Sequence, residues 1–306
     1  MNIKQKILLW LRAIRAPFFS ATAMSAVIAA GLAYSEGKFS WFYLAAAVLI
    51  IAGSNCGINL INDYFDHKSG NDEVNKYFNP FSGGSRVIQD NLIKPRQILI
   101  AGIIAFVVTA LFGLYFVIFV NYHLIWFGLA AILLGYFYTA KPVKFVYRGV
   151  GELLVFIKSG PLAVLGTYFL FTGKLSLEAF LISIPQGLLV TLILFINEFP
   201  DYEADKAVGK RHLVVRFGRQ KSRVIYIFLI AAVYLSVIIP AALLISPLFL
   251  LISLLTIPFA VQASVVAFKN YNSEIAILPA QAKTIFLTLS FGMLLTIGYV
   301  IDKLVR

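Results

Sequence analysis

Two stretches decide the fold: residues 41–66, WFYLAAAVLIIAGSNCGINLINDYFD, and residues 178–205, EAFLISIPQGLLVTLILFINEFPDYEAD. Each contains an apolar run close to the ~20 residues that a helix needs to cross a bilayer. Each then ends in closely spaced asparagine and acidic residues. The pattern predicts two membrane helices that carry polar groups to the edge of the membrane.

The composition of the whole chain agrees with this prediction. Its 306 residues are 60% apolar and 13% charged, against roughly 45–50% and about 25% in a soluble domain. So few charges exclude a soluble enzyme, a disordered chain and a coiled coil, and the single cysteine, Cys56, excludes a disulfide scaffold. The apolar runs are continuous, unlike the alternating strands of a transmembrane barrel. We therefore expect an all-α integral membrane protein with one domain, residues 1–306.

Nine apolar segments lie between breaks that are rich in polar and turn residues. Each is close to the length of one transmembrane helix. The predicted spans are 17–34, 41–62, 97–118, 122–140, 150–170, 178–199, 222–241, 247–267 and 283–301.

The basic residues predict the orientation of these spans. Of the 26 lysines and arginines, 21 lie on the side of the N-terminus, 4 lie on the other side, and Lys158 alone lies within a span. Because basic loops stay in the cytoplasm, we expect the N-terminus on the cytoplasmic side of the cell membrane and the C-terminus on the outer side. The same rule accounts for the net charge of +12 without a nucleic-acid partner.

Eight of the 14 acidic residues lie between residues 63 and 73 or between 198 and 205, at the same predicted face. Helical spacing places two sets of three residues on common faces: Asn59, Asp63 and Asp66, and Asn197, Asp201 and Asp205. Two facing rows of carboxylates repel each other unless cations lie between them. Oxygen ligands suit Mg²⁺, which also binds substrate phosphates. All six are therefore candidate metal ligands, and the four aspartates are candidate catalytic residues.

Lysines and arginines are also frequent around these acids. Carboxylates and cations at the mouth of a membrane cavity favour a diphosphate held through Mg²⁺, with an apolar tail among the spans. The candidate diphosphate-binding residues are Arg86, Lys141, Arg148, Lys158, Lys206 and Lys210. Lys158 lies inside the fifth span, where a charge needs a cavity or a partner. A structural ion pair with Glu152 is the alternative for that residue.

Two other interpretations of the acids stay open. Asparagines and aspartates at helix ends are often simple caps, and acids in loops are often solvated. A cation-coupled transporter also carries ionisable residues in its spans, but at midplane depth in broken helices. Here the acids lie at the ends of the predicted spans.

The order, side and spacing of the two motifs resemble the UbiA superfamily of intramembrane prenyltransferases over nearly the whole chain. The resemblance implies nine helices around a central cavity with an acidic cytoplasmic cap. It also implies transfer of a polyprenyl group from a polyprenyl diphosphate, bound through Mg²⁺, to an acceptor within the membrane lipid. Arg15 is similar to a family position beside the diphosphate.

Finer features resemble the branch that prenylates 1,4-dihydroxy-2-naphthoate for menaquinone biosynthesis. They are the late Asp72 after Gly70, the run from Gly209 to Gly218, and the turn from Tyr147 to Glu152. The chain departs from that branch at His212, at Glu152 and in the loop 79–86. Other acceptors stay open: 4-hydroxybenzoate, a tocopherol-type ring, a carotenoid, chlorophyllide or glyceryl phosphate.

Aromatic residues near the predicted cavity mouth suggest a pocket for the reacting groups. An aromatic face attracts a cation, which would favour the allylic carbocation of a prenyl transfer. We assign Tyr138 and Tyr147 to this pocket, together with Asn62, which extends the first polar stripe.

The nine-span topology can be tested by labelling single cysteines in a Cys56→Ser background. A membrane-impermeant thiol reagent added from the cytoplasmic side should label cysteines at Ser69 and Gly209. Cysteines at Lys38 and Lys174 should react only from the opposite side, because an odd number of spans separates them from the first pair. Labelling of all four positions from one side would contradict the topology.

Overall fold

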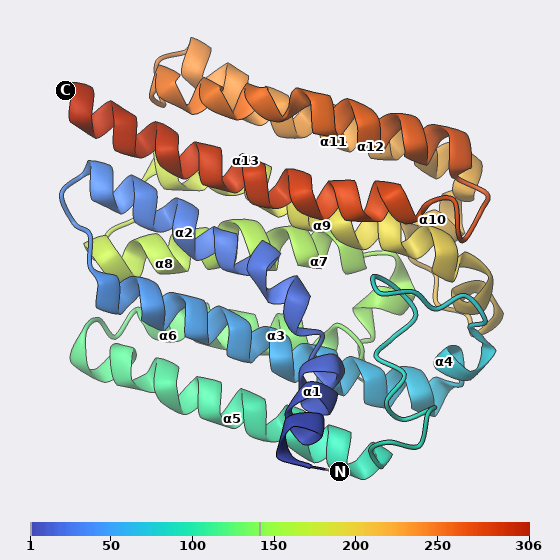
Figure 1. The fold of residues 1–306 in the computed structure, drawn as a ribbon. Coiled ribbons are helices and arrows are strands. Elements are labelled where there is room, and N and C mark those ends of the chain that lie inside the picture. The colour runs from blue at the N-terminus through green and yellow to red at the C-terminus, as the bar shows by residue number, and fades with distance from the viewer. Residues whose placement is uncertain (1, 141) are drawn as a thin grey trace.

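The computed structural model describes residues 2–140 and 142–306, and these residues form helices with no β-sheet (Figure 1). The longer helices are α1 (Ile3–Ala13), α2 (Phe19–Ser35), α3 (Trp41–Ser69), α5 (Pro95–Phe119), α6 (Leu124–Phe137), α8 (Ala163–Thr172), α9 (Leu177–Ala207), α11 (Arg219–Ala242), α12 (Ile257–Asn270) and α13 (Leu278–Val305). The shorter ones are η1 (Ala16–Phe18), α4 (Asn71–Val74), η2 (Phe145–Arg148), α7 (Gly151–Ile157), η3 (Lys158–Leu162), α10 (Leu213–Phe217) and η4 (Leu248–Thr256).

Eight helical stretches among the described residues are long and apolar enough to cross a membrane, and they coincide with eight of the nine predicted spans. The remaining span, predicted over 122–140, is the shorter helix α6. Its 14 residues reach about 21 Å, less than the ~30 Å hydrocarbon core. The helix ends at Phe137, five residues ahead of Pro142, and a proline cannot supply the backbone N–H that would extend the helix.

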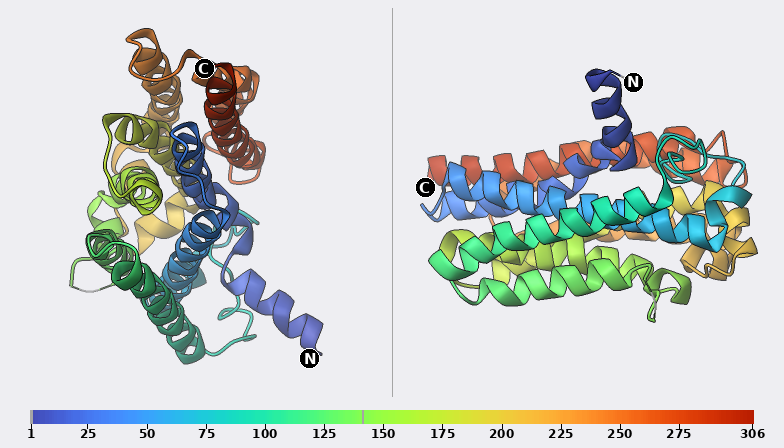
Figure 2. Two further views of the ribbon diagram at one scale, coloured as in Figure 1. Left: turned by 90° about the vertical axis from the view of Figure 1, so that its left-hand side faces the viewer. Right: turned by 90° about the horizontal axis from the view of Figure 1, so that it is seen from below.

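The long helices lie side by side, and α4 and its loops gather at one end of the bundle (Figures 1 and 2). Helix α9 is the most buried of the candidate spans and packs against α11, α7 and α13. Helix α3 packs along α5, and α2 packs along α13. The outward faces, on α5 above all, keep large apolar side chains exposed, as lipid contact requires. The chain is therefore a multi-pass membrane protein.

Two of these helices extend past their predicted spans. Helix α3 continues from residue 62 to Ser69, and α9 continues past Pro200 to Ala207. Pro200 lies inside α9 without ending it, so the second motif is carried on continuous helix. Both acidic motifs are consequently carried on helix, at the same end of the bundle.

One glycine sets how closely the fifth span approaches α9. A methyl group on Gly160 would lie 2.6 Å from the backbone oxygen of Ser183 and 2.8 Å from the Cα of Gly187. Gly160 belongs to η3, a single turn of π-helix between α7 and α8. Only a glycine fits there, because the neighbouring atoms are backbone and have little freedom to move.

We expect Gly160→Ala to lower the thermal unfolding temperature of the detergent-solubilised protein. Overpacking a close contact typically costs about 1–3 kcal/mol. Gly113→Ala is the matched control, because a methyl group there meets nothing within 4 Å and alanine favours the helix. Equal melting temperatures for the two variants would contradict this account of the contact.

Candidate functional site

A polar cavity of about 250 Å³ lies where α3 and α9 extend past the bundle. It is lined by residues from the first helices, from both acidic motifs and from the loop after α9. Of the residues predicted for the site, it brings together Arg15, Asn59, Asn62, Asp66, Tyr138, Lys158, Asn197, Asp201, Asp205 and Lys210. The two motifs, far apart in sequence, therefore face one space.

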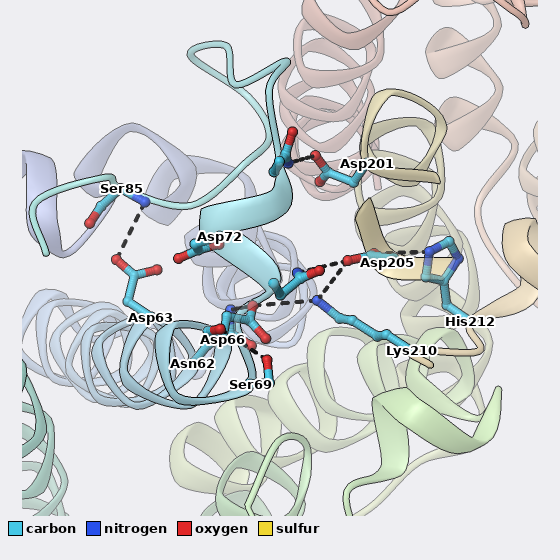
Figure 3. A network of polar contacts seen from close by, with 12 residues as sticks. Asn62, Asp63, Asp66, Ser69, Asp72, Ser85, Asp201, Asp205, Lys210 and His212 are labelled. Carbon is cyan, nitrogen blue, oxygen red and sulfur yellow. Dashed lines mark hydrogen bonds and ion pairs between the residues drawn. The ribbon is translucent and has the colours of Figure 1, made fainter. Parts of the chain in front are cut away.

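Lys210 joins the two acidic motifs (Figure 3). Its ammonium lies 3.4 Å from Asp66 Oδ2 on α3 and 3.5 Å from Asp205 Oδ1 on α9. Burial lowers the pKa of Lys210, but the negative charges of Asp205 and Asp66 outweigh burial and place this pKa well above its ordinary value. The lysine is therefore a fixed positive charge between two carboxylates.

Helix α4 covers the cavity and was not foreseen from the sequence. The Asn71 amide donates to Asp205 Oδ1 at 2.8 Å, and the Asn75 amide donates to Asp201 Oδ1 at 2.8 Å. The chain can fold back because Gly70 ends α3 with φ of 79°, a left-handed conformation that glycine adopts without strain. In the sequence, the glycine after the first motif indicates a turn at the end of α3. The contacts of the two asparagines with α9 have no such signal.

Asp63 lies beside the cavity and is not part of its lining. It is buried, pairs with the Arg15 guanidinium, and accepts a hydrogen bond from the Ser85 backbone N–H at 3.3 Å (Figure 3). Asp63 thus holds Arg15, which does line the cavity. Arg15 itself has φ of 54°, which turns the chain sharply between α1 and the first span.

A second group of buried ionisable side chains supports the second motif. His212 Nε2 lies 3.0 Å from Asp205 Oδ2, and its Nδ1 lies 3.3 Å from Glu198 Oε2. Burial lowers the pKa of His212, but the charge of Glu198 and hydrogen bonds with both acids raise it to about 10. The histidine is therefore charged at neutral pH and ties Asp205 to Glu198. Glu152 completes the group, with ligand atoms of Glu152, Glu198 and His212 within 4.8 Å of one another.

An apolar cavity of about 440 Å³ adjoins the polar one. Helices α3, α5, α6 and α8 form most of its wall. The two cavities share four lining residues, Thr22, Asn55, Lys158 and Ser159. A molecule with a charged head and a long apolar tail would fit across this junction.

Comparison with known sequences identifies the family. The sequence model of the UbiA prenyltransferase family matches residues 23–278. This chain belongs to that family. It is therefore a prenyltransferase, and the resemblance carried by its two motifs is confirmed.

Individual relatives support this family assignment. A 1,4-dihydroxy-2-naphthoate octaprenyltransferase from Bacillus subtilis is 31% identical, over 80% of this chain and 76% of that protein. A 2-carboxy-1,4-naphthoquinone phytyltransferase from Synechocystis is 28% identical, over 95% of this chain and 92% of that protein. A UbiA homologue from Archaeoglobus fulgidus, solved bound to DMAPP and Mg²⁺, has a TM-score of 0.60 at 15% identity, covering 94% of this chain and 98% of that one. The last comparison shows that the fold is shared.

The polar cavity of this UbiA prenyltransferase has the donor set that Mg²⁺ requires. Asp66 Oδ1 and Asn71 Oδ1 are buried oxygens without a hydrogen-bond partner among the described residues. Burial and the charges of Asp66 and Asp63 raise the pKa of Asp72, which also lines the cavity, to about 8. Unsatisfied oxygens and an excess of buried carboxylates both indicate a shortage of positive charge, which a hard divalent cation with oxygen ligands would supply.

The other predicted site residues that the structure describes lie outside this cavity lining. Arg86 donates to the backbone oxygens of Asp72 and Asn75 and thereby ties the loop to α4. Arg148 and Lys206 are exposed, and Tyr147 lies under the Lys144 ammonium. Lys141 falls outside the described residues.

We expect Lys210→Met to destabilise the protein, because removing one partner from a buried ionic group typically costs about 3–5 kcal/mol. Thermal unfolding in detergent with excess EDTA should show a clear fall in melting temperature, and MgCl₂ should restore part of it by replacing the lost charge. Lys269→Met, a change at an exposed lysine on α12, is the control. A variant at Lys210 that melts like this control in both conditions would contradict the bridging role.

Proposed function

We propose that this UbiA prenyltransferase transfers a polyprenyl group from a polyprenyl diphosphate to an aromatic acceptor, 1,4-dihydroxy-2-naphthoate, in menaquinone biosynthesis. The observation that carries this proposal is the junction between the acidic, cation-containing cavity and the apolar cavity. A polyprenyl diphosphate has the same two-part chemistry. The naphthoate acceptor is supported by the names of the relatives in Bacillus subtilis and Synechocystis.

In this proposal the carboxylates of both motifs bind Mg²⁺. Asp66, Asp201 and Asp205 would hold the ions, with Asn59 and Asn197 as neutral oxygen ligands at the same cavity. When bound, Mg²⁺ neutralises the charge that develops on the leaving diphosphate. Asn62 donates to Asp66 Oδ2 at 2.8 Å and so orients the carboxylate that faces the metal.

Lys210 and Arg15 are the protein's own cations for the diphosphate. Both line the cavity, and both can form charge-assisted hydrogen bonds to phosphate oxygens. Asp63 keeps Arg15 oriented through their ion pair. Lys210 is already paired with two carboxylates, so its ammonium is held in place before the diphosphate arrives.

The transfer itself forms one carbon–carbon bond. The allylic C–O bond breaks and its electron pair leaves with the diphosphate. The electron-rich ring then donates a pair to the allylic carbon, and the carboxyl group leaves as carbon dioxide, returning its bonding pair to the ring. The Tyr138 ring borders the cavity and would stabilise the positive carbon, while the apolar wall excludes water.

The membrane orientation belongs to the same proposal. We infer that the acidic cavity opens on the cytoplasmic side of the cell membrane. Of the 26 basic residues, 21 lie on the same side as this cavity, and basic loops are retained in the cytoplasm. The family match over residues 23–278 supports one prenyltransferase domain over the chain.

The decisive assay combines purified enzyme, a polyprenyl diphosphate, MgCl₂ and 1,4-dihydroxy-2-naphthoate labelled in its carboxyl group. We expect release of labelled carbon dioxide together with a prenylated 1,4-naphthalenediol, the reduced form of the quinone, and loss of turnover in excess EDTA. Asp66→Asn and Asp201→Asn should each lower the rate by at least the ~10–100-fold typical for damage to a metal site.

Asp302→Asn, at a carboxylate paired with Arg306 on α13, serves as the control for these variants. Full turnover in excess chelator would remove the metal from the proposal. Turnover of 4-hydroxybenzoate without turnover of the naphthoate would overturn the acceptor.

A further inference from the structure

Lys158 is the one cation that lines both cavities among the described residues. It lies at the start of η3, the π-helical turn. Its neighbours Ser159 and Gly160 pack against the bundle: Ser25 Oγ donates to the Ser159 oxygen at 2.5 Å, and Gly160 lies against α9. Packing on that side leaves the Lys158 side chain directed to the junction of the cavities.

The ammonium of Lys158 lacks a carboxylate partner within the described chain. Its hydrogen bond goes to Asn55 Oδ1 at 2.6 Å, and the Asn55 amide in turn donates to Thr22 Oγ1 at 2.5 Å. Glu152, the partner considered from the sequence, accepts from the Leu213 backbone N–H at 2.5 Å and groups with Glu198 and His212. The structural ion pair is thus absent among the described residues, and Lys158 is a half-buried charge whose hydrogen-bond partner is a neutral amide.

The depth of Lys158 separates it from the diphosphate-binding end. Asp66 lies eleven positions beyond Asn55 on α3, which is about 16 Å along a helix axis. Lys210 and the second motif lie at the Asp66 end. A diphosphate bound between Lys210 and the motif carboxylates would therefore lie toward the Asp66 end of the polar cavity, and its prenyl chain would pass Lys158 on the way to the apolar cavity.

We propose that Lys158 binds the negatively charged group of the acceptor and holds the acceptor at the junction of the two cavities. This inference rests on the proposed function and replaces the diphosphate-binding role that the sequence suggested for Lys158. An unpaired charge in an apolar surrounding is costly. An acceptor that brings its own anion removes this cost when it binds, whereas a neutral acceptor does not.

The same charge would act on the chemical step. A lysine ammonium near the allylic carbon repels the positive charge that develops there, and this repulsion is strong where the dielectric constant is low. An acceptor anion paired with Lys158 cancels the repulsion. Ionisation of the diphosphate is then favoured when the acceptor is in place and disfavoured when it is absent.

The test compares Lys158→Met, Lys158→Gln and Lys158→Arg with the wild type on two acceptors, 1,4-dihydroxy-2-naphthoate and 1,4-naphthalenediol, which lacks the carboxylate. For Lys158→Met and Lys158→Gln we expect KM for the naphthoate to rise about 10- to 100-fold, the range for losing a hydrogen bond to a charged group. KM for the diol and KM for the polyprenyl diphosphate should each stay within about twofold. Lys158→Arg should recover most of the naphthoate affinity.

Two further measurements exclude a purely structural role. The melting temperature of Lys158→Met should be unchanged or higher than that of the wild type, because an unpaired, half-buried charge is removed. Release of diphosphate without any acceptor should increase in Lys158→Met. Lys269→Met, at an exposed lysine, should behave as the wild type in every assay.

Three results would contradict either the role of Lys158 or the proposed acceptor. A rise in KM for the polyprenyl diphosphate, or an equal rise for both acceptors, would overturn the proposal. If the wild type uses neither naphthalene but prenylates geranylgeranylglyceryl phosphate, the naphthoate function fails. In that case a rise in KM for the phosphate acceptor in Lys158→Met would support the anion-binding role, and no change would overturn it.

Discussion

The structure depends on one electrostatic constraint, the burial of carboxylates from two helices that face each other across a small space. In a low-dielectric surrounding such groups repel strongly, and the bundle cannot close over them without positive charge. Lys210 between Asp66 and Asp205, Arg15 against Asp63 and His212 against Asp205 provide part of it. Asn71 and Asn75 add amide donors from above. The positive charge that is still lacking is what the proposed Mg²⁺ would supply at this end of the bundle.

Local sequence pattern was enough to predict the membrane helices and the two acidic motifs. Apolar runs of membrane length located eight spans, and the i, i+4 spacing put each motif on one helical face. The pattern could not show that Asp63 pairs with Arg15 beside the cavity, or that Asn75, after α4, donates a hydrogen bond to Asp201. Such contacts depend on how the chain returns after Gly70, which is a tertiary property. For the same reason a simple count of nearby cations included Arg148 and Lys206, whose side chains are exposed.

The two departures from the branch pattern, His212 and Glu152, lie together in the structure. They form one buried group with Glu198, in which one histidine lies close to two acids. Within this group, the His212 ring lies on the side of Asp205 away from the Lys210 ammonium (Figure 3). It acts on the site by fixing the orientation of that carboxylate, and it illustrates how a charged residue is tolerated in a membrane protein when its counter-charges are buried with it.

The short helix α6 has a consequence for the surrounding lipid. With 14 residues it spans about two thirds of an ordinary hydrocarbon core, and such hydrophobic mismatch is relieved by local thinning of the bilayer. Helix α6 also forms part of the wall of the apolar cavity, through residues such as Leu124, Gly128 and Ile132. Such thinning would draw the lipid headgroups closer to the midplane beside this cavity. An amphiphile arriving from the membrane would move its charged head a shorter distance through hydrocarbon at α6 than beside the full-length helices.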